Sequence, residues 1–282
     1  MGCFHTGLKR IFNVLLPASF AWAACLPIYA QAPLQATEPA AIAHVAVQVS
    51  DLAKSREFYE RLGYEEAFAL DQGGAPTEAF LKVNDRQFIE LYPQRNPSQT
   101  VGFLHVCFES EDLEKLNQFY LSRGLTPTPV RRAGAGNLLF TMEGPEKQNI
   151  EYTQYMPGSR HTNDRGKHLG ADRIANRIAG VGIGMHDPAA ASAFYTEKLG
   201  FRSTHSFVSG QVAFAIPGDA TQQIDFLAPL PDASFELFLA VPNLHSAAAE
   251  LKARNIPAQK RGKTLAISDP DGNQILFTEA RF

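Results

Sequence analysis

IAHVAVQV (42–49) is the first of four apolar segments that decide the fold of this chain. The other three are QFIELYP (87–93), GFLHVCFE (102–109) and NIEYTQY (149–155). Each segment has a histidine or glutamate enclosed by apolar neighbours, in the order His44, Glu90, His105 and Glu151. The interval from histidine to glutamate is 46 residues in both pairs. Short apolar runs of this kind are typical of buried strands, so the segments predict two copies of one structural unit.

A helix is predicted in each unit, between its first strand and its later strands. The segments DLAKSREFYERLG (51–63) and DLEKLNQFYLSRG (112–124) both begin with an aspartate suited to cap a helix. Both end with a glycine suited to terminate one. The later strands are predicted near 64–70, 78–84 and 87–93 in the first unit, and near 126–131, 137–142 and 149–155 in the second.

Two further units follow the first two. The third begins at 178 with IAGVGIGM, and its helix contains FYTEKLGF (194–201), which closely resembles FYERLGY (58–64). The fourth has a strand at 234–241 and ends with QILFTEA (274–280). In every unit the helix precedes consecutive strands with short turns, an order that does not suit an all-parallel sheet. The repeat predicts an α+β protein of four βαβββ modules.

The N-terminal residues 1–30 have the pattern of a secretory signal peptide. Two basic residues at 9–10 precede an apolar run, 11–24, that is shorter than the roughly 20 residues needed to span a bilayer. Small residues suited to cleavage follow, with the best cut near Ala30. A linker, 31–40, comes next. We therefore expect a periplasmic or secreted protein with no stable membrane insertion after cleavage.

Composition narrows the functional classes. The net charge of −3 gives no basic surface for nucleic acid, so a small molecule is the expected partner. Removal of residues 1–30 would leave Cys107 as the only cysteine, so no intramolecular disulfide is expected. The oligomeric state is not predicted by any feature of the sequence.

The polar segment 157–177 separates the second module from the third. It marks a domain boundary, with one predicted domain at 41–156 and another at 178–282. A plain surface linker is the preferred interpretation of this segment, and a strap that lines a pocket mouth is the alternative. Five histidines lie in linkers, caps or helix starts and are assigned no role: His161, His168, His186, His205 and His245.

Glu90 and Glu151 predict a bound cation. Each follows an isoleucine in an apolar strand, and an unpaired carboxylate is costly to bury there. One strand histidine or glutamate alone is usually structural, but two of each at one interval predict a single metal site. Two imidazoles and two carboxylates suit a divalent ion such as Fe(II), Mn, Co, Ni or Zn. Cys107 shares a strand face with His105, and a small buried hydrophobe is its preferred role.

The four modules, the FYxxxLG helix ends and the His/Glu/His/Glu register resemble the vicinal oxygen chelate superfamily. That resemblance covers about residues 40–282. It implies that the modules pair into two curved-sheet, half-barrel domains. It also implies that His44, Glu90, His105 and Glu151 are metal ligands, as in bacterial glyoxalase I. Dioxygenases of the superfamily use two His and one Glu, a set that His44, His105 and Glu151 also satisfy.

The third and fourth modules depart from this ligand pattern. Alignment of the modules puts Gly180 at the His44 position, Asp225 at the Glu90 position, Glu236 at the His105 position and Leu276 at the Glu151 position. This set is not a credible transition-metal site. We therefore expect neighbouring modules to pair and the C-terminal domain to have no metal of its own.

Three functions remain open. The first is a metal-dependent lyase or isomerase of the glyoxalase kind, in which Glu90 or Glu151 transfers the substrate proton. The second is an Fe(II) extradiol-type dioxygenase with a three-residue ligand set. The third is a protein of the resistance type that binds a small molecule without turnover.

Overall fold

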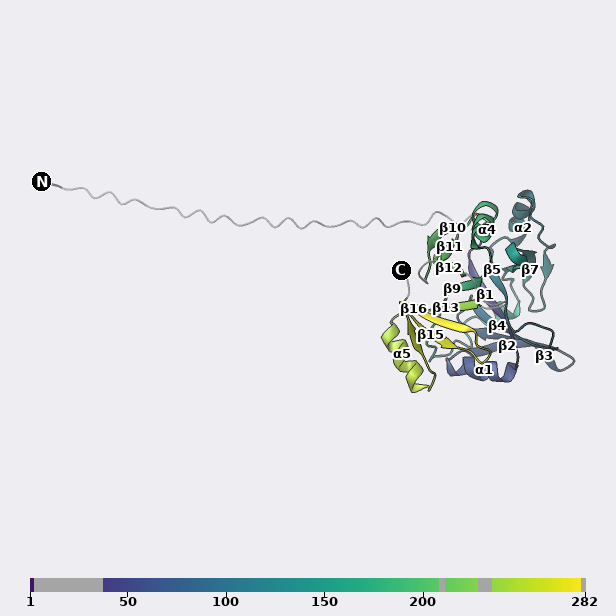
Figure 1. Cartoon of the computed structure of the whole chain (residues 1–282), viewed down its shortest axis with the longest axis horizontal. Coiled ribbons are helices and arrows are strands. Elements are labelled where there is room, and N and C mark those ends of the chain that lie inside the picture. The colour runs from purple at the N-terminus through teal and green to yellow at the C-terminus, as the bar shows by residue number, and fades with distance from the viewer. Residues whose placement is uncertain (3–37, 208–210, 228–234, 280–282) are drawn as a thin grey trace. The chain divides into compact units, whose positions relative to one another are not determined.

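The computed structural model describes residues 1–2, 38–207, 211–227 and 235–279. The chain divides into a unit of residues 1–33 and a compact unit of residues 34–282, and the elements below belong to the second (Figure 1). The predicted signal peptide, except for its first two residues, and its cleavage point lie outside the described residues. Within the described ranges, no helix has the length and apolar character needed to cross a membrane.

The first two modules form one eight-stranded sheet in the order β2-β3-β4-β1-β5-β8-β7-β6. The first module contains β1 (Ala41–Val49), α1 (Leu52–Arg61), β2 (Glu65–Gln72), β3 (Ala75–Lys82) and β4 (Phe88–Pro93). The second contains β5 (Gly102–Glu109), α2 (Leu113–Ser122), β6 (Arg131–Arg132), β7 (Leu138–Glu143), a 3-10 turn (Pro145–Lys147) and β8 (Asn149–Gln154). The predicted strand near 126–131 is wrong in extent, because Pro127 and Pro129 have no amide hydrogen for a sheet ladder.

The last two modules form a second eight-stranded sheet in the order β10-β11-β12-β9-β13-β16-β15-β14. The third module contains β9 (Ile178–Gly184), α4 (Pro188–Ala193), a π-helical turn (Phe194–Lys198), β10 (Arg202–His205), β11 (Val212–Ile216) and β12 (Asp219–Leu227). The fourth contains β13 (Phe235–Val241), α5 (Leu244–Ala253), β14 (Gln259–Arg261), β15 (Thr264–Ser268) and β16 (Gln274–Glu279). The predicted α+β fold of four βαβββ modules in two sheets is confirmed.

Neighbouring modules pair, as predicted. Strand β1 runs antiparallel to β5 in the first sheet, and β9 runs antiparallel to β13 in the second. Within each module the first and last strands are parallel neighbours, so β1 lies beside β4 and β5 lies beside β8. The predicted helix caps are also present, since Asp51 and Asp112 accept backbone amide hydrogen bonds at the starts of α1 and α2. This pairing brings the four predicted ligand strands together in the order β4-β1-β5-β8.

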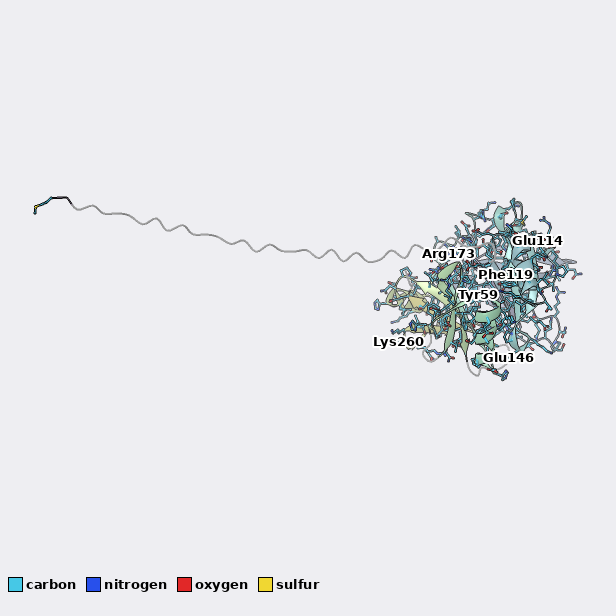
Figure 2. All side chains as sticks on the ribbon, turned by 90° about the horizontal axis from the view of Figure 1, so that it is seen from above. Tyr59, Glu114, Phe119, Glu146, Arg173 and Lys260 are labelled. Carbon is cyan, nitrogen blue, oxygen red and sulfur yellow. The ribbon has the colours of Figure 1, made fainter. Side chains whose placement is uncertain are left out.

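One face of the first sheet packs into a core that it shares with the second sheet. Val45, Val47 and Val49 of β1 belong to this core, and so does Val181 of β9. Burial of each such side chain stabilises the fold by about 1.5–3 kcal/mol. Figure 2 shows the fully buried Tyr59 among the packed side chains. Because strand residues alternate between faces, His44, one residue before Val45, points away from this core.

Gln87 joins the two sheets through hydrogen bonds. Its side-chain amide donates to the carbonyl oxygens of Ile42 (3.1 Å) and Ile178 (3.2 Å), and its oxygen accepts from the Ile178 amide (2.9 Å). Ile42 is the second residue of the strand that carries His44, and Ile178 is the first residue of the corresponding strand of the second sheet. These hydrogen bonds therefore fix the start of β1 against the start of β9.

Candidate metal centre

Strand register brings the four predicted ligands to one place. Ala46 of β1 lies opposite both Glu90 of β4 and His105 of β5. Cys107 lies opposite both His44 and Glu151. The equal interval of 46 residues in the two modules thus becomes equal placement on the two sides of the β1–β5 pair.

Three of the ligand atoms surround one point. His44 Nε2 lies 3.0 Å from His105 Nε2 and 3.3 Å from Glu151 Oε1, and His105 Nε2 lies 4.0 Å from the same oxygen. A triangle with these sides has a centre about 2.0 Å from every corner, which matches the bond lengths of divalent metals to imidazole and carboxylate. The geometry of these three side chains therefore fits a single transition-metal ion.

Glu90 contacts the opposite nitrogen of His44. Its Oε1 lies 3.0 Å from His44 Nδ1. In the neutral imidazole, a proton on Nδ1 would be donated to Glu90 and would leave the lone pair on Nε2 free for a metal. A carboxylate that orients a ligand histidine in this way is a common second layer of metal sites. The structure thus brings Glu90 into the cluster, but on the side of His44 that faces away from the three-atom triangle.

The charges of the cluster favour a cation. Burial alone would raise the pKa of Glu90, but the charge of His44 and a hydrogen bond to it lower this pKa to about 2. Burial would likewise raise the pKa of Glu151, and the two histidines lower it. Burial would lower the pKa of His44, yet Cys107 and Glu90 raise it well above its usual value. The two buried carboxylates therefore stay charged. They stabilise a proton on His44, at the place where a metal would otherwise bind.

Cys107 lies beside this cluster. It is fully buried, and its sulfur falls within 4.8 Å of ligand atoms of His44 and Glu151. Burial raises the pKa of its thiol, and the Glu151 charge adds to this against an opposing effect of His44. A neutral thiol agrees with the expected role of a small buried hydrophobe.

Glu78 and Tyr92 also line a cavity beside the cluster, and the sequence did not predict either of them. The Tyr92 hydroxyl donates to a Glu78 carboxylate oxygen and lies 3.3 Å from Glu90 Oε2. Burial, followed by the charge of Glu90, raises the pKa of Glu78 to about 9. Glu78 is therefore a neutral acid beside a charged one. A weak signal existed, because Tyr92 lies two residues after Glu90 on the same strand face.

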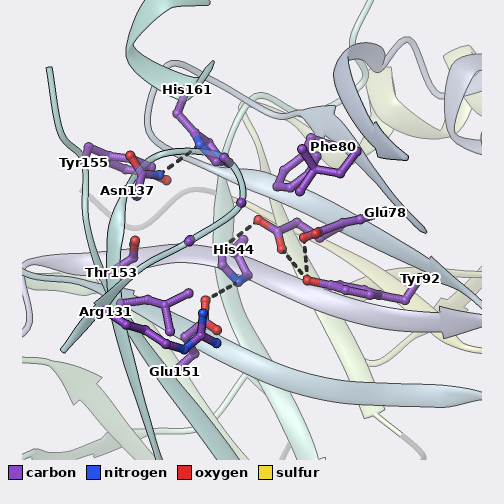
Figure 3. Close-up of a pocket in the computed structure, with 16 residues that line it drawn as sticks. His44, Glu78, Phe80, Tyr92, Arg131, Asn137, Glu151, Thr153, Tyr155 and His161 are labelled. Carbon is purple, nitrogen blue, oxygen red and sulfur yellow. Dashed lines mark hydrogen bonds and ion pairs between the residues drawn. The ribbon is translucent and has the colours of Figure 1, made fainter. Parts of the chain in front are cut away.

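A cavity of about 210 Å³ opens beside the cluster. Its polar lining includes His44, Glu78, Glu90, Tyr92, Arg131, Asn137, Glu151, Thr153, Tyr155 and His161. Its apolar lining includes Leu70, Phe80 and Leu139. In Figure 3, Arg131 and Glu151 lie on one side of the cavity, His161 lies on the other, and His44 lies between them. The cavity therefore gives a small ligand direct access to the cluster.

His161 reaches the cavity from the segment between the two domains. It lies on α3 (Arg160–Asn163), and its ring packs against Phe68, Phe80 and Phe88 with centroid separations of 5.0, 5.3 and 4.7 Å. The predicted alternative, a strap that lines a pocket, is therefore confirmed for this part of 157–177. The sequence analysis assigned His161 no role, and the structure places its side chain in the lining of the cavity.

The second sheet has other residues at the ligand positions. Its strand register aligns Gly180, Asp225, Glu236 and Leu276 with the four ligand positions, as the module alignment predicts. Asp225 accepts hydrogen bonds from Ser206 and from the Phe207 amide, and Glu236 forms an ion pair with Arg261. Among the described residues, the groups close enough to share a metal all belong to the first sheet.

Comparisons with known proteins agree with this architecture. Residues 41–152 match the family model described as the Glyoxalase/Bleomycin resistance protein/Dioxygenase superfamily. The 2,3-dioxygenase LapB from Pseudomonas sp. KL28 is similar, with 18% identity, a TM-score of 0.69, and coverage of 88% of this chain and 94% of that one. The Mn(II)-bound glyoxalase from Novosphingobium aromaticivorans has 15% identity, a TM-score of 0.66, and coverage of 86% and 83%.

A third solved structure has the same fold. It is homoprotocatechuate 2,3-dioxygenase from Arthrobacter globiformis, with 18% identity, a TM-score of 0.64, and coverage of 89% of this chain and 83% of that one. No curated protein sequence matches this chain. Paired βαβββ modules around a His/Glu cluster define a class of metal-site proteins. Residues 41–152 thus match the superfamily of glyoxalases, bleomycin resistance proteins and dioxygenases, and the chain as a whole has the fold of the three solved structures.

Proposed function

We propose that this protein is an Fe(II) enzyme of the extradiol dioxygenase type, which acts on a small molecule with two adjacent oxygen atoms. The observation that carries the proposal is the triangle of His44 Nε2, His105 Nε2 and Glu151 Oε1. Two histidines and one carboxylate form the ligand set of non-haem Fe(II) oxygenases, and they leave positions open for substrate and O₂. The related dioxygenases and the related glyoxalase share this fold, so the ligand geometry has to separate the two chemistries.

The residues of the chain have distinct roles in this proposal. The metal, when bound, would supply Lewis-acid activation of the substrate oxygens and a binding position for O₂. His44, His105 and Glu151 would hold it. Glu90 orients His44 through the hydrogen bond to Nδ1. Glu78, the neutral acid that shares a hydrogen bond with Tyr92 beside Glu90, would serve as a proton donor to the bound substrate.

A second candidate is the metal-dependent lyase or isomerase of the glyoxalase kind. It is supported by a cluster in which ligand atoms of His44, Glu90 and His105 all lie within 4.8 Å of one another. There, Glu90 would complete a set of two histidines and two glutamates, and Glu90 or Glu151 would transfer the substrate proton. Mn, Ni, Co or Zn would serve this chemistry as well as Fe.

Oxygen consumption separates the candidates. The protein is reconstituted anaerobically with Fe(II) or Mn(II) and mixed with catechol, and O₂ uptake is recorded beside the variants His105→Ala and His245→Ala. The proposal expects uptake with Fe(II), no uptake in His105→Ala, and unchanged uptake in His245→Ala, whose side chain is exposed on α5. Saturable binding of the diol without O₂ uptake or any product would contradict it and favour a binding protein.

Export of the protein is a separate proposal. It rests on the basic start, the apolar run and the small residues of 1–30. Expression of the full chain in a bacterium, followed by N-terminal sequencing of the periplasmic fraction, tests it. A mature end near residue 31 is expected, and an uncleaved chain retained in the cytoplasm would contradict export.

A further inference from the structure

Some polar groups that line the cavity have hydrogen-bond partners within the protein, and others do not. Four side chains outside the metal cluster are paired with protein groups. Thr153 donates to the Leu138 carbonyl oxygen, Tyr155 donates to the Arg86 carbonyl oxygen, Tyr92 donates to Glu78, and Asn137 bonds to His161 and to the Met156 amide. Two groups have no hydrogen-bond or ion-pair partner within the described ranges: the Arg131 guanidinium and His161 Nε2. The Arg131 side chain is exposed and open to a ligand, whereas His161 Nε2 is buried.

The orientation of Asn137 makes His161 Nε2 a donor. The Asn137 oxygen accepts from the Met156 amide (3.2 Å), so its NH₂ group faces His161 Nδ1 at 2.9 Å. Nδ1 is therefore the acceptor, and the proton of the neutral ring lies on Nε2. Both groups without a partner are consequently donors, and a ligand that pairs with the exposed one, Arg131, has to bring acceptors.

Arg131 adds a positive charge to a cavity otherwise lined by three glutamates. It is the only Lys or Arg in the lining, and it extends from the two-residue strand β6 toward Glu151 (Figure 3). The next residue, Arg132, lies outside the lining and donates to the Gly136 carbonyl oxygen at 2.7 Å. One arginine of this pair is thus bound within its own turn, and the other faces the cavity.

We propose that Arg131 is the anchor of an anion subsite, and that the substrate carries a carboxylate in addition to its two metal-binding oxygens. This inference rests on the proposed function. Guanidinium groups bind carboxylates through paired, charge-assisted hydrogen bonds. The volume of about 210 Å³ lies below the roughly 300–1,000 Å³ of sites for drug-sized ligands. The substrate class is therefore a small anionic diol, such as a dihydroxybenzoate.

Two probes that differ by one carboxylate test the proposal. Affinities of catechol and 3,4-dihydroxybenzoate are measured by calorimetry on the Mn(II)-loaded protein without O₂, for wild type, Arg131→Gln and Arg132→Gln. We expect wild type and Arg132→Gln to bind the carboxylated probe about tenfold to a hundredfold more tightly than catechol. In Arg131→Gln the advantage should disappear while catechol affinity stays unchanged. Arg132→Gln removes the same charge one residue away and controls for general electrostatics.

The outcomes separate this inference from the proposed function. If both diols bind the wild type equally, or if Arg132→Gln loses the preference as fully as Arg131→Gln, the anion subsite is overturned and the diol chemistry stands. If the carboxylated probe alone binds, and Arg131→Gln abolishes that binding, the subsite is supported whereas the diol chemistry is not. Binding of neither probe to the metal-loaded protein would contradict both.

Discussion

His44 makes two different contacts with its two ring nitrogens, and the site depends on this division. Nδ1 faces Glu90, whereas Nε2 faces His105 and Glu151. The two nitrogens of one imidazole cannot bind the same ion. The role of each glutamate therefore depends on which nitrogen of His44 it contacts. Glu151 shares the ion-binding side and Glu90 orients the ring. His161 is divided in the same way, with Nδ1 bound to Asn137 and Nε2 left as a donor.

Asn137→Asp should reverse the tautomer of His161. A carboxylate accepts where the amide donates, so the proton should move to Nδ1. The pKa of His161, which burial lowers to about 4, should rise toward neutrality. ¹⁵N NMR of labelled histidines over a pH series measures both changes, and His161→Gln identifies the signal. Asn163→Asp, on the exposed side of α3 with its amide on the Gly158 carbonyl oxygen, is the control. An unchanged tautomer in Asn137→Asp would contradict the assigned donor role.

The metal-free protein should lose stability as the pH rises from about 6 to 9. The pKa of His44 is raised in the folded state, so its proton stabilises the fold below the ordinary value of 6.5 and this contribution is lost above it. Glu78, with a pKa of about 9, acts in the same direction, because the folded state keeps a proton that the unfolded state releases near 4.5. Each pH unit within these intervals removes up to about 1.4 kcal/mol per group.

Thermal unfolding of chelator-treated protein across this range measures the loss. A Tm that falls by several degrees toward pH 9 is expected, and added metal should remove most of the fall because it replaces the proton on His44. A Tm that stays level or rises with pH in the metal-free protein would contradict the charge balance described for the cluster.

At the scale of elements, the strap between the domains is held in place by one buried lysine. Lys82, at the end of β3, is fully buried and bonds to Asp164, immediately after α3, through the carboxylate (2.8 Å) and the carbonyl oxygen (2.5 Å). It also pairs with Asp85 at 2.8 Å. Since His161 precedes Asp164 by less than one helical turn, this ion pair fixes the position of His161 in the cavity.

Lys82→Met should destabilise the protein by about 3–5 kcal/mol, because Asp164 would remain buried with only the half-exposed His168 beside it. The double variant Lys82→Met/Asp164→Asn should recover a large part of this loss. Urea unfolding measures the free energies, and brief trypsin digestion reports release of the strap at Arg160 or Arg165. Lys54→Met, which removes an exposed pair with Asp51 at 3.5 Å, is the control and should change stability by less than about 1 kcal/mol. Similar losses in Lys82→Met and Lys54→Met would contradict the anchoring role.

The repeat explains which parts of the site sequence reasoning reached. His44, Glu90, His105 and Glu151 occur in matched pairs, and the parallel first and last strands of each module convert that match into proximity. Glu78, Arg131 and His161 have no counterpart in a second module. Their places depend on the strand register of β3, on the prolines that shorten β6, and on the path of the strap. Each of these is set by tertiary packing and not by the local pattern.

At the scale of the whole molecule, the two sheets have the same topology but different interiors. The first holds the ionisable cluster. The corresponding face of the second is filled by apolar side chains, including Phe238 and Leu276, with Phe207 packed against them. The chain should therefore bind one metal ion and not two. The second sheet contributes by packing against the strand that carries His44, since β1 contacts both β9 and β12.

Metal content of three proteins would decide the ligand geometry most directly. Wild type, Glu90→Gln and Glu151→Gln are reconstituted anaerobically with Fe(II), passed through a desalting column against a weak chelator, and analysed for iron per chain. We predict about one iron in the wild type, little in Glu151→Gln, and retained iron in Glu90→Gln with an affinity lowered by about tenfold to a hundredfold. Equal loss of iron in the two glutamate variants would show that Glu90 binds the metal directly, as Glu151 does. That result would contradict the three-residue site.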